Sequence, residues 1–355
     1  MKIGIFDPYF DDLGGGEKYM MTVAQCLASN HNVDVFWDNN NDVEELKRRF
    51  SFNLSRINFA KNIFSPKVST FRRLLITKKY DVIILLSDGS IPITLSKKTF
   101  IHFQQPISEL RLNFKDKFKI KKITKFFCNS KYTKSYIDRS LNIDSSILYP
   151  PVSLRPTKDN KENIILHVGR FRVRNVNADD YKKQGVMIEA FKEMIKRGLL
   201  NWKFVLAVSV KKNEEKIFNE FKKRTENFPI EFSINNTNDH LWNIYSKAKI
   251  YWHASGLGED LLRHPEYAEH FGISTVEAMG AGNVPVVINA GGQKEIVEDK
   301  KNGFLWNTLE ELIDKTKILT EDQDLWSKMS KEAIKRANFF GGDRFCSDLR
   351  HILEL

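Results

Sequence analysis

The sequence contains few cysteines, and none of them has the spacing of metal ligands. Cys26, Cys128 and Cys346 are the only three in 355 residues, and the chain holds no CxxC pair and no cluster of cysteine with histidine. Structural zinc sites and disulfide frameworks need closely spaced or numerous cysteines. The composition therefore indicates a protein of a reducing compartment without structural zinc.

Long hydrophobic runs are also missing. No apolar stretch approaches the roughly 20 residues that a membrane-spanning helix needs, and the opening "MKIGIFDPYF" is typical of a strand rather than of a secretory signal. Internal repeats of solenoid length and low-complexity tracts are absent as well. We expect a soluble cytoplasmic protein, which leaves open a peripheral position at the inner face of a membrane.

The length and composition favour two globular domains. A chain of 355 residues exceeds one ordinary core and suggests two domains of roughly 150 to 200 residues. Hydrophobic residues make up 41% and charged residues 28%, which excludes widespread disorder. The net charge of +11 is uneven, because residues 1–150 hold 24 basic and 15 acidic side chains. An anionic partner of the N-terminal half is therefore expected.

Short apolar runs alternate with helical patterns in the first 150 residues. This alternation predicts parallel strands buried between two helix layers, which is a Rossmann-like, doubly wound α/β domain. The expected strands are residues 2–6, 32–37, 80–87, 99–103 and 125–130.

The proline-rich stretch "LYPPVSLRP" interrupts this pattern at residues 148–156 and predicts a linker. The alternation then resumes, so residues 151–340 predict a second Rossmann-like domain. The closing segment 341–355 is expected to be a helix that can cross back to the N-terminal domain 1–150. Two such domains are expected to face a cleft at the carboxyl ends of their strands, where ligands of such sheets bind.

A run of three glycines follows the first strand in "FDPYFDDLGGGEKYM". Gly15 and Gly16 lie where a helix begins, so their amides are candidates to face a phosphate or a reacting sugar. Tyr19 stands where a dinucleotide fingerprint needs its third glycine, and the chain has no Walker A sequence. A simple glycine turn remains the alternative.

Two positively charged positions follow the first strand of the C-terminal half. Arg170 lies just beyond "NIILHVG", and Lys182 or Lys183 lies just before the next helix. Both positions belong to the carboxyl edge of a strand, where a guanidinium and an ammonium suit a pyrophosphate. Solvated surface cations are the alternative reading.

The segment "EHFGISTVEAMGAGNVPVVINAGGQKEIV" carries the strongest signal. We expect Gly272 to begin a helix, with Glu269 in the loop before it and Glu277 about one turn inside. The amides of Ile273, Ser274 and Thr275 would then be free to hold a diphosphate. Each glutamate would accept hydrogen bonds from hydroxyl groups at one end of the ligand.

These residues resemble the retaining glycosyltransferases of family 4, which have the GT-B fold and an E-x7-E motif. The wording is most similar to the branch that contains lipid-linked-oligosaccharide mannosyltransferases. Further similar segments are the GGGE loop, "FIHFQQP", "CNSKYT", "YPPV" and "GRF" followed by a lysine.

The resemblance implies a role for each matching residue. Arg170 and Lys182, with Lys183 as the alternative, would bind the donor diphosphate, and Glu277 would bind the ribose. Glu269 would contact the donor sugar. The remaining positions would contact the donor through their backbone or line the reaction centre: Gly272, Ile273 and Ser274, then Gly15, Gly16 and His102.

One departure from the family pattern is the charged insertion "GLGEDLLRHPEYA" at residues 256–268. Glu259 or Asp260 within it is a candidate to share the role of Glu269. The other histidines, His240, His253, His264 and His270, have no convincing ligand spacing and are expected to be structural.

The resemblance implies a retaining transfer of mannose or another hexose from a GDP-sugar or UDP-sugar to a glycan or lipid-linked glycan. No enzyme nucleophile is evident, so we expect attack from the face of the leaving group. Arg170, Lys182 and the helix N-terminus would stabilise the departing phosphate. No metal or other cofactor is expected, since the one D-x-D, Asp322 and Asp324, suits a helix N-cap.

Residues 111–127, "RLNFKDKFKIKKITKFF", interleave lysine with phenylalanine and isoleucine. Such a segment is a candidate to lie on an anionic membrane surface, and a solvated helix is the alternative. No nucleic-acid-binding pattern is present. A nucleotide-sugar epimerase and a non-catalytic membrane- or polyanion-binding protein of the same fold stay open as other functions.

Overall fold

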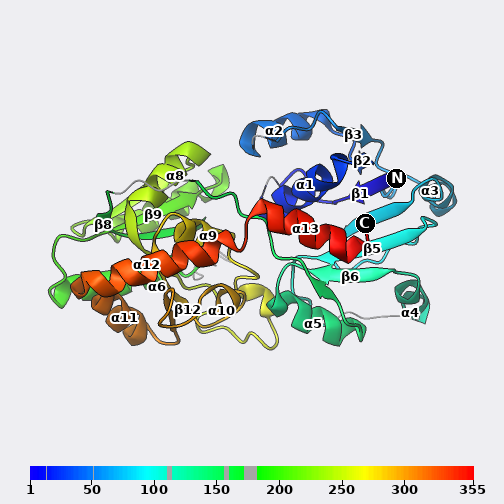
Figure 1. Cartoon of the computed structure of the whole chain (residues 1–355). Helices are drawn as coiled ribbons and strands as arrows, with labels where there is room; N and C mark the ends of the chain where they lie inside the picture. The colour runs from blue at the N-terminus through cyan, green and yellow to red at the C-terminus, as the bar shows by residue number, and fades with distance from the viewer. Residues whose placement is uncertain (13, 51, 110–113, 156–159, 172–181) are drawn as a thin grey trace. The chain divides into compact units, whose positions relative to one another are not determined.

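The computed structural model describes residues 1–12, 14–50, 52–109, 114–155, 160–171 and 182–355. The chain divides into two compact units (Figure 1). Unit 1 consists of Met1–Pro151 together with Gly342–Leu355, and unit 2 consists of Val152–Gly341. Each unit is described by itself below.

Unit 1 is built on a parallel sheet of seven strands in the order β3-β2-β1-β4-β5-β6-β7. Its strands are β1 Lys2–Phe6, β2 Asn32–Phe36, β3 Ile57–Ala60, β4 Val82–Ser87, β5 Lys98–Phe103, β6 Lys125–Cys128 and β7 Ser146–Ile147. Every residue of β4 is buried, which a parallel sheet achieves only when helices cover both of its faces.

Helices pack on both faces of this sheet. They are α1 Gly15–Ala28, α2 Asn40–Phe50, α3 Thr70–Thr77, α4 Phe114–Lys121, α5 Lys131–Leu141 and α13 Gly342–Leu353. One hydrophobic cluster joins the sheet to α1 and to α13, through Phe345 and Leu349 of the latter. A second cluster on the other residues of the same strands joins them to α3, α4 and α5 through Ile76, Ile120 and Ile137.

The C-terminal helix α13 belongs to unit 1, and a disulfide between Cys26 and Cys346 joins it to α1. The sequence analysis expected a reducing compartment and did not predict this disulfide. Cys128 is the buried free thiol. The two paired residues lie 320 positions apart in the sequence. Their pairing depends on the packing of α13 against α1, which the spacing of cysteines does not reveal.

Unit 2 is built on a parallel sheet of six strands in the order β10-β9-β8-β11-β12-β13. The strands are β8 Glu162–Arg170, β9 Lys203–Ser209, β10 Ile230–Ile234, β11 Ala248–His253, β12 Val284–Ile288 and β13 Phe304–Trp306. The helices are α6 Gln184–Lys196, α7 Glu215–Lys223, α8 Asn238–Lys247, α9 Ile273–Gly280, α10 Gln293–Ile296, α11 Leu309–Glu321 and α12 Gln323–Asn338. The predicted α/β class with two doubly wound sheets is confirmed.

Both sheets reverse their strand order at one point. In unit 1 the order runs outward in opposite directions from β1 and β4, and in unit 2 from β8 and β11. Connections that follow such a pair of strands diverge to opposite faces and leave a crevice at the carboxyl ends. Each unit therefore has one place where a ligand is expected.

No helix within the described ranges is both long enough and apolar enough to cross a lipid bilayer.

Candidate functional site

The crevice of unit 2 brings together the loop before α6, the end of β11 and the loop before α9. Lys182 precedes α6, His253 is the last residue of β11, and Glu269 lies three residues before Gly272. Two of the predicted residues are in direct contact, since Lys182 Nζ lies 2.8 Å from Glu269 Oε2. The Lys182 and Glu269 side chains are 19% and 21% exposed, so the pair is mostly withdrawn from water.

A histidine completes this contact. His253 Nε2 lies 3.1 Å from the same carboxylate oxygen of Glu269. The sequence did not predict this contact of His253 with the main candidate acid. A useful signal was available, since His253 ends a buried strand at the edge where ligands bind.

The electrostatics of this cluster fix the charge of each member. Burial alone would raise the pKa of Glu269, but Lys182 and His253 outweigh it and hold the pKa well below its usual value. Burial lowers the pKa of His253, although Glu269 opposes the shift. Glu269 is therefore an anion at neutral pH, and a neutral His253 donates its Nε2 hydrogen to it.

The insertion at residues 256–268 supplies a second ion pair beside the first. Lys183 Nζ lies 2.8 Å from Glu259 Oε1, and both side chains are nearly buried. Asp260 instead accepts a hydrogen bond from the amide of Arg263. The two neighbouring lysines thus have different partners, Lys182 with Glu269 and Lys183 with Glu259, and the insertion provides a counter-charge rather than a substitute for Glu269.

Gly272 begins α9 as the sequence predicts, and its conformation requires glycine. Its φ is +120°, and an added Cβ would lie 2.9 Å from Gln293 Nε2. The amide of Thr275 donates to the carbonyl of Gly272, so the expectation that this amide is free was wrong. Ile273 and Ser274 hold the first two helical positions, where an amide has no acceptor within its own helix.

Two glycines that follow β12, Gly291 and Gly292, hold the loop before α9 in place. The amide of Gly292 donates to the carbonyl of Glu269 over 2.7 Å. A side chain at Gly291 would meet the backbone of Glu269, and one at Gly292 would meet the backbone of Phe271. These glycines allow the AGGQ loop to hold the loop that carries Glu269.

Glu277 lies inside α9, where its carboxylate accepts a hydrogen bond from the Tyr245 hydroxyl over 3.1 Å. One turn earlier, Ser274 Oγ lies 2.8 Å from the Tyr251 hydroxyl. Both tyrosines are buried, and burial raises both of their pKa values. They remain neutral and orient the polar side chains along the first turns of α9.

Arg170 ends β8 and is exposed, while its carbonyl accepts a hydrogen bond from Gln184 at the start of α6. The chain between them, residues 172–181, lies outside the described residues. Arg170, Lys182, Glu269 and the start of α9 therefore gather at the carboxyl ends of β8 and β11. A carboxylate, two cationic side chains and the first amides of a helix at one sheet edge suit a polyhydroxylated anion such as a sugar diphosphate.

The comparison with protein families agrees with this geometry. The model described as "Glycosyl transferases group 1" matches residues 154–336, which is just over half of the chain. The chain belongs to this glycosyl transferase family. The match covers the site of unit 2 from β8 to α12.

Curated relatives of the glycosyltransferase carry one name. The chain resembles the "GDP-Man:Man(3)GlcNAc(2)-PP-Dol alpha-1,2-mannosyltransferase" of Dictyostelium discoideum, with 28% identity over 61% of this chain and 44% of that protein. The namesake of Xenopus tropicalis is 32% identical over 47% of this chain and 34% of its own length. The chain therefore spans less than half the length of these relatives.

Solved structures match the whole glycosyltransferase chain. A glycosyltransferase of Rickettsia africae has a TM-score of 0.76 at 17% identity and covers 99% of this chain and 98% of its own. HepE of Anabaena, solved in complex with UDP, has a TM-score of 0.71 at 16% identity, with 100% of each chain covered. This likeness confirms the expected GT-B architecture of two Rossmann-like units.

In unit 1 of the glycosyltransferase, the three predicted residues belong to the start of α1 and to β5. Gly15 is the first residue of α1, and the carbonyl of Gly16 accepts a hydrogen bond from Gln104 Nε2 over 3.2 Å. An added Cβ at Gly16 would meet the Gln104 side chain. His102 lies in β5, two residues before that glutamine.

His102 is packed as an aromatic residue of the core. Its ring stacks between Tyr19 and Phe127 with centroid distances of 4.4 and 4.5 Å, and its Nδ1 lies 3.0 Å from the Phe127 carbonyl. Burial lowers the pKa of His102 to about 3. The ring is therefore neutral, with Nδ1 donating and the buried Nε2 left as an acceptor without a partner in the described structure.

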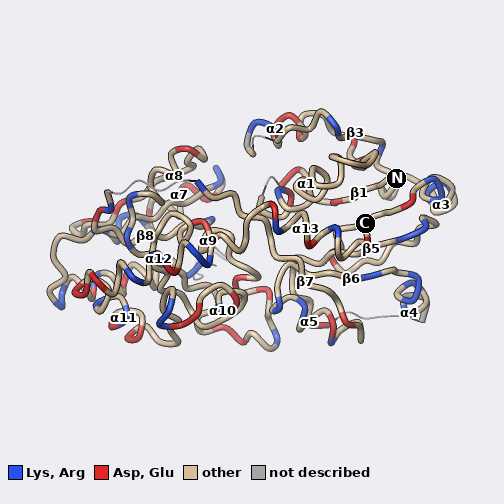
Figure 2. Tube along the Cα trace, viewed as in Figure 1, with Lys and Arg blue, Asp and Glu red and all other residues tan. Residues whose placement is uncertain are grey.

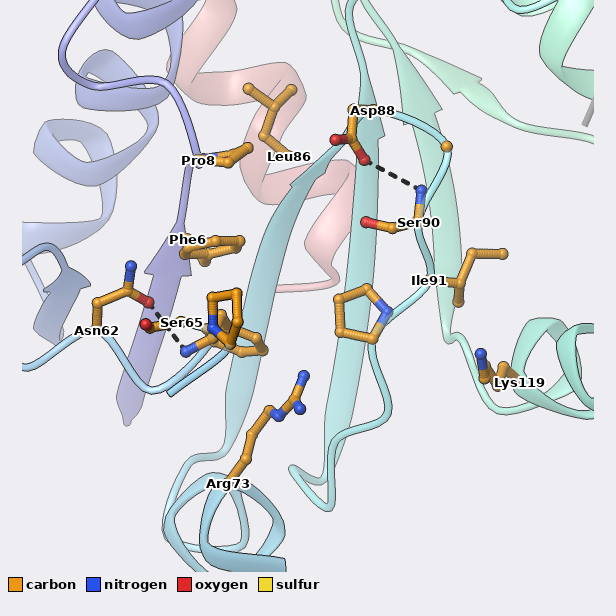
Figure 3. A pocket seen from close by; sticks show the side chains of 14 residues that line it. Phe6, Pro8, Asn62, Ser65, Arg73, Leu86, Asp88, Ser90, Ile91 and Lys119 are labelled. Carbon is orange, nitrogen blue, oxygen red and sulfur yellow. Dashed lines mark hydrogen bonds between the residues drawn. The ribbon is translucent and has the colours of Figure 1, made fainter. Parts of the chain in front are cut away.

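A cavity of about 620 Å³ opens beside β1 and β4 in the same unit (Figure 3). Its walls combine Phe6 and Phe64, whose rings stack at 4.6 Å, with Arg73 of α3, Lys119 of α4 and Asp88. The sequence pointed to the loop after β1 but missed this cavity. Its polar residues come from four separate segments, and no motif links them.

Asp7 is a further residue that the sequence reading missed. It follows β1, is fully buried, and accepts a hydrogen bond from the Tyr9 amide through Oδ1, while Oδ2 has no partner in the described structure. Burial raises the pKa of Asp7 to about 8 against the effect of that amide, and Glu17 and Asp11 add to the rise. Asp7 therefore keeps its proton at neutral pH.

The D-x-D sequence is an N-cap, as expected. Asp322 caps α12 by accepting a hydrogen bond from the Leu325 amide over 2.8 Å.

Proposed function

We propose that this protein is a retaining glycosyltransferase that moves a hexose from a nucleotide-diphosphate sugar to a glycan or lipid-linked glycan. The observation that carries the proposal is the cluster of Lys182, His253 and Glu269 beside the N-terminus of α9. Family membership supports the reaction class. Unit 2 binds the donor, and unit 1 binds the acceptor.

In this proposal, Arg170 and Lys182 bind the diphosphate together with the first amides of α9, Ile273 and Ser274. A lysine Nζ carries three hydrogens, and the contact with Glu269 uses one of them. Lys182 can therefore hold Glu269 and a phosphate oxygen at the same time. Lys183 supports the site through Glu259, which keeps a second cation at its edge.

The two glutamates receive opposite ends of the donor. Glu269, held as an anion, accepts hydrogen bonds from hydroxyl groups of the transferred sugar. Glu277 accepts hydrogen bonds from the ribose, with Tyr245 fixing its second oxygen. Gly272 allows the backbone of the loop to approach the sugar between them.

The chemical step proceeds on the face of the leaving group. The bond between the anomeric carbon and the phosphate oxygen breaks, and the acceptor hydroxyl forms a bond to the same carbon from the same side. The acceptor's proton passes to the departing diphosphate, so no enzyme nucleophile takes part. Arg170, Lys182 and the N-terminus of α9 stabilise the charge that develops on the phosphate. We expect transfer without an added metal ion, and it should persist in a chelator.

Unit 1 contributes residues on the acceptor side. Gly15 begins α1 without a side chain, so that a hydroxyl group can approach its backbone. Gly16 makes room for Gln104, which donates to the Gly16 carbonyl. His102 acts as a hydrogen-bond acceptor through Nε2, because its Nδ1 hydrogen is engaged by Phe127. The cavity beside β1 and β4 is our candidate for the next part of the acceptor.

The names of the relatives favour a particular substrate pair. The curated relatives are named for transfer from GDP-mannose to a dolichol-linked oligosaccharide, whereas HepE was solved with UDP. We propose GDP-mannose as the donor and a lipid-linked oligosaccharide as the acceptor. An enzyme with such an acceptor works at a membrane surface, which supports a peripheral position.

The test is a panel of nucleotide sugars scored by thermal stabilisation, followed by transfer assays with the best donor. A donor that binds only the folded state raises the melting temperature, and at 100 times its Kd the gain is about 2.7 kcal/mol. We expect GDP-mannose to stabilise the protein, and glycosyl transfer to occur only with an acceptor present. Turnover of the donor alone into an isomer would favour an epimerase, and the absence of any stabilising nucleotide sugar would refute the donor site.

A further inference from the structure

Three neighbouring segments of unit 1 contain basic residues and no acidic ones. Residues 70–79, 91–98 and 117–122 together hold ten lysines and arginines and not a single aspartate or glutamate. Figure 2 shows this basic character along α3 and α4. We call these three segments the basic surface.

The same segments expose large apolar side chains. On α3, Phe71 is 72% and Leu75 is 51% exposed, and their four-residue spacing puts them on one side of the helix. The other members are Ile93, Leu95 and Phe118. Exposed phenylalanine and leucine beside lysine are not explained by the folding of unit 1, because the inward side of α3 is supplied by Ile76 and Thr77.

Direct contacts show that the three segments lie together. The Leu95 amide donates to Thr77 Oγ1 over 3.0 Å, which fixes the loop after β4 on the end of α3. Arg73, Ile91 and Lys119 line one cavity, one residue from each segment (Figure 3). The three segments are therefore neighbours that border one cavity. Phe71 and Leu75 lie with Lys78 on the side of α3 that is turned away from Arg73.

We propose that the basic surface docks on an anionic lipid bilayer, with Phe71, Leu75 and Phe118 inserted among the headgroups. Apolar insertion and electrostatic attraction are the two contributions that bind an interfacial helix to a membrane. Three carboxylates face this surface. Asp81 and Glu354 pair with Lys97 and Lys98 at its edge. Asp88, which accepts hydrogen bonds from the Tyr9 hydroxyl and the Ser90 amide, lines the cavity. This proposal deepens the membrane part of the proposed function and rests on it.

The structure also corrects the surface expected from residues 111–127. Within that stretch, β6 begins at Lys125 and buries Phe126 and Phe127 in the core of unit 1. The described part that stays exposed is the end of α4 with the lysines after it. The other exposed apolar side chains of the basic surface come from α3 and from residues 91–98, which are distant in sequence from α4.

Sedimentation with lipid vesicles tests the proposal on the full chain, without donor or turnover. We expect the protein to pellet with vesicles of phosphatidylcholine and phosphatidylglycerol, to stay in solution with phosphatidylcholine alone, and to dissociate in high salt. Phe71→Ser/Leu75→Ser should weaken binding at least tenfold, since both exposed side chains would be buried in the interface. Each of Lys121→Gln and Lys122→Gln should weaken it by about fivefold.

The matched control is Leu200→Ser/Leu262→Ser in unit 2, where both leucines are as exposed as Phe71. It should bind vesicles like the unaltered protein. Equal binding to both kinds of vesicle, unchanged binding of the α3 variant, or an equal loss in the control would overturn the proposal. Vesicle binding and donor-induced stabilisation are separate measurements, so a failure here leaves the proposed reaction standing and the reverse also holds.

Discussion

Replacement of Glu269 by glutamine is the sharpest test of the donor site. The substitution keeps the shape of the side chain but removes the charge that Lys182 and His253 contact. If the role proposed for Glu269 is right, the protein should stay folded while transfer falls sharply. The size of both effects follows from the geometry.

The stability cost of Glu269→Gln is modest. A hydrogen bond to a charged group contributes about 1.5–3 kcal/mol when buried, but both partners of the ion pair are about one-fifth exposed, and water replaces part of the loss. We expect the free energy of unfolding to fall by about 1–2 kcal/mol, or roughly 2–8 °C in Tm for a unit of this size. From a typical stability of about 5–15 kcal/mol, the folded fraction hardly changes.

The effect on transfer should be much larger. Loss of one preorganised hydrogen-bonding group in an active site reduces kcat by about 10²–10³-fold, or roughly 2.7–4 kcal/mol. A stability change of about 1–2 kcal/mol in a folded protein cannot produce such a loss. Glu269→Ala should abolish transfer, because it also removes the carboxylate that Lys182 contacts.

The assay compares kcat with the chosen donor and the Tm of each variant at neutral pH. Because the pKa of Glu269 is lowered, its stabilisation is complete above the ordinary glutamate value and disappears only as the pH falls below it. The Tm difference between Glu269→Gln and the unaltered protein should therefore shrink in acid. Glu310→Gln, an exposed acid of the same unit, should change neither kcat nor Tm. An active Glu269→Ala would refute the assigned role.

Further predictions concern both units. Arg170→Ala should abolish donor-induced stabilisation without lowering Tm, since Arg170 is exposed; retained stabilisation would remove it from the donor site. Asp7 has a raised folded pKa of about 8, so stability should fall as the pH rises from about 4 to 8, and Asp7→Asn should flatten this profile measured by Tm. Cys346→Ser should lower the free energy of unfolding of unit 1 by about 2–4 kcal/mol in denaturant titrations, with Cys128→Ser as the control without a lost crosslink.

Most of the fold was predictable from buried apolar runs. The strand at residues 2–6 has the expected bounds, and the other four strands predicted in the first 150 residues agree within two residues. Among the elements of unit 1 that were not predicted are α2 Asn40–Phe50, β3 Ile57–Ala60 and the short strand β7. The first is rich in charge, and the second is a four-residue edge strand that is only half-buried, so neither presents a continuous apolar signal.

The donor side of the site was more predictable than its internal partners. The position of Gly272 at the start of α9 and the closeness of Lys182 to the loop of Glu269 follow from glycine chemistry and from the edge of the sheet. The contact between His253 and Glu269 could not be read from spacing, because it depends on how β11 and the loop before α9 meet in three dimensions. The disulfide and the cavity of unit 1 were hidden for the same reason, since each is made by segments that only the tertiary fold brings together.

The ion pairs of unit 2 explain how the site can hold its lysines in place before a donor arrives. A free lysine side chain has many rotamers, and fixing one costs up to about 2 kcal/mol of conformational entropy. Glu269 and Glu259 hold the Nζ atoms of Lys182 and Lys183 in the folded protein. This conformational entropy is therefore lost during folding and not when the donor binds. In the proposed site, a diphosphate would meet ammonium groups that are already ordered. The carboxylates thus need not compete with the donor, and their removal should weaken donor binding instead of strengthening it.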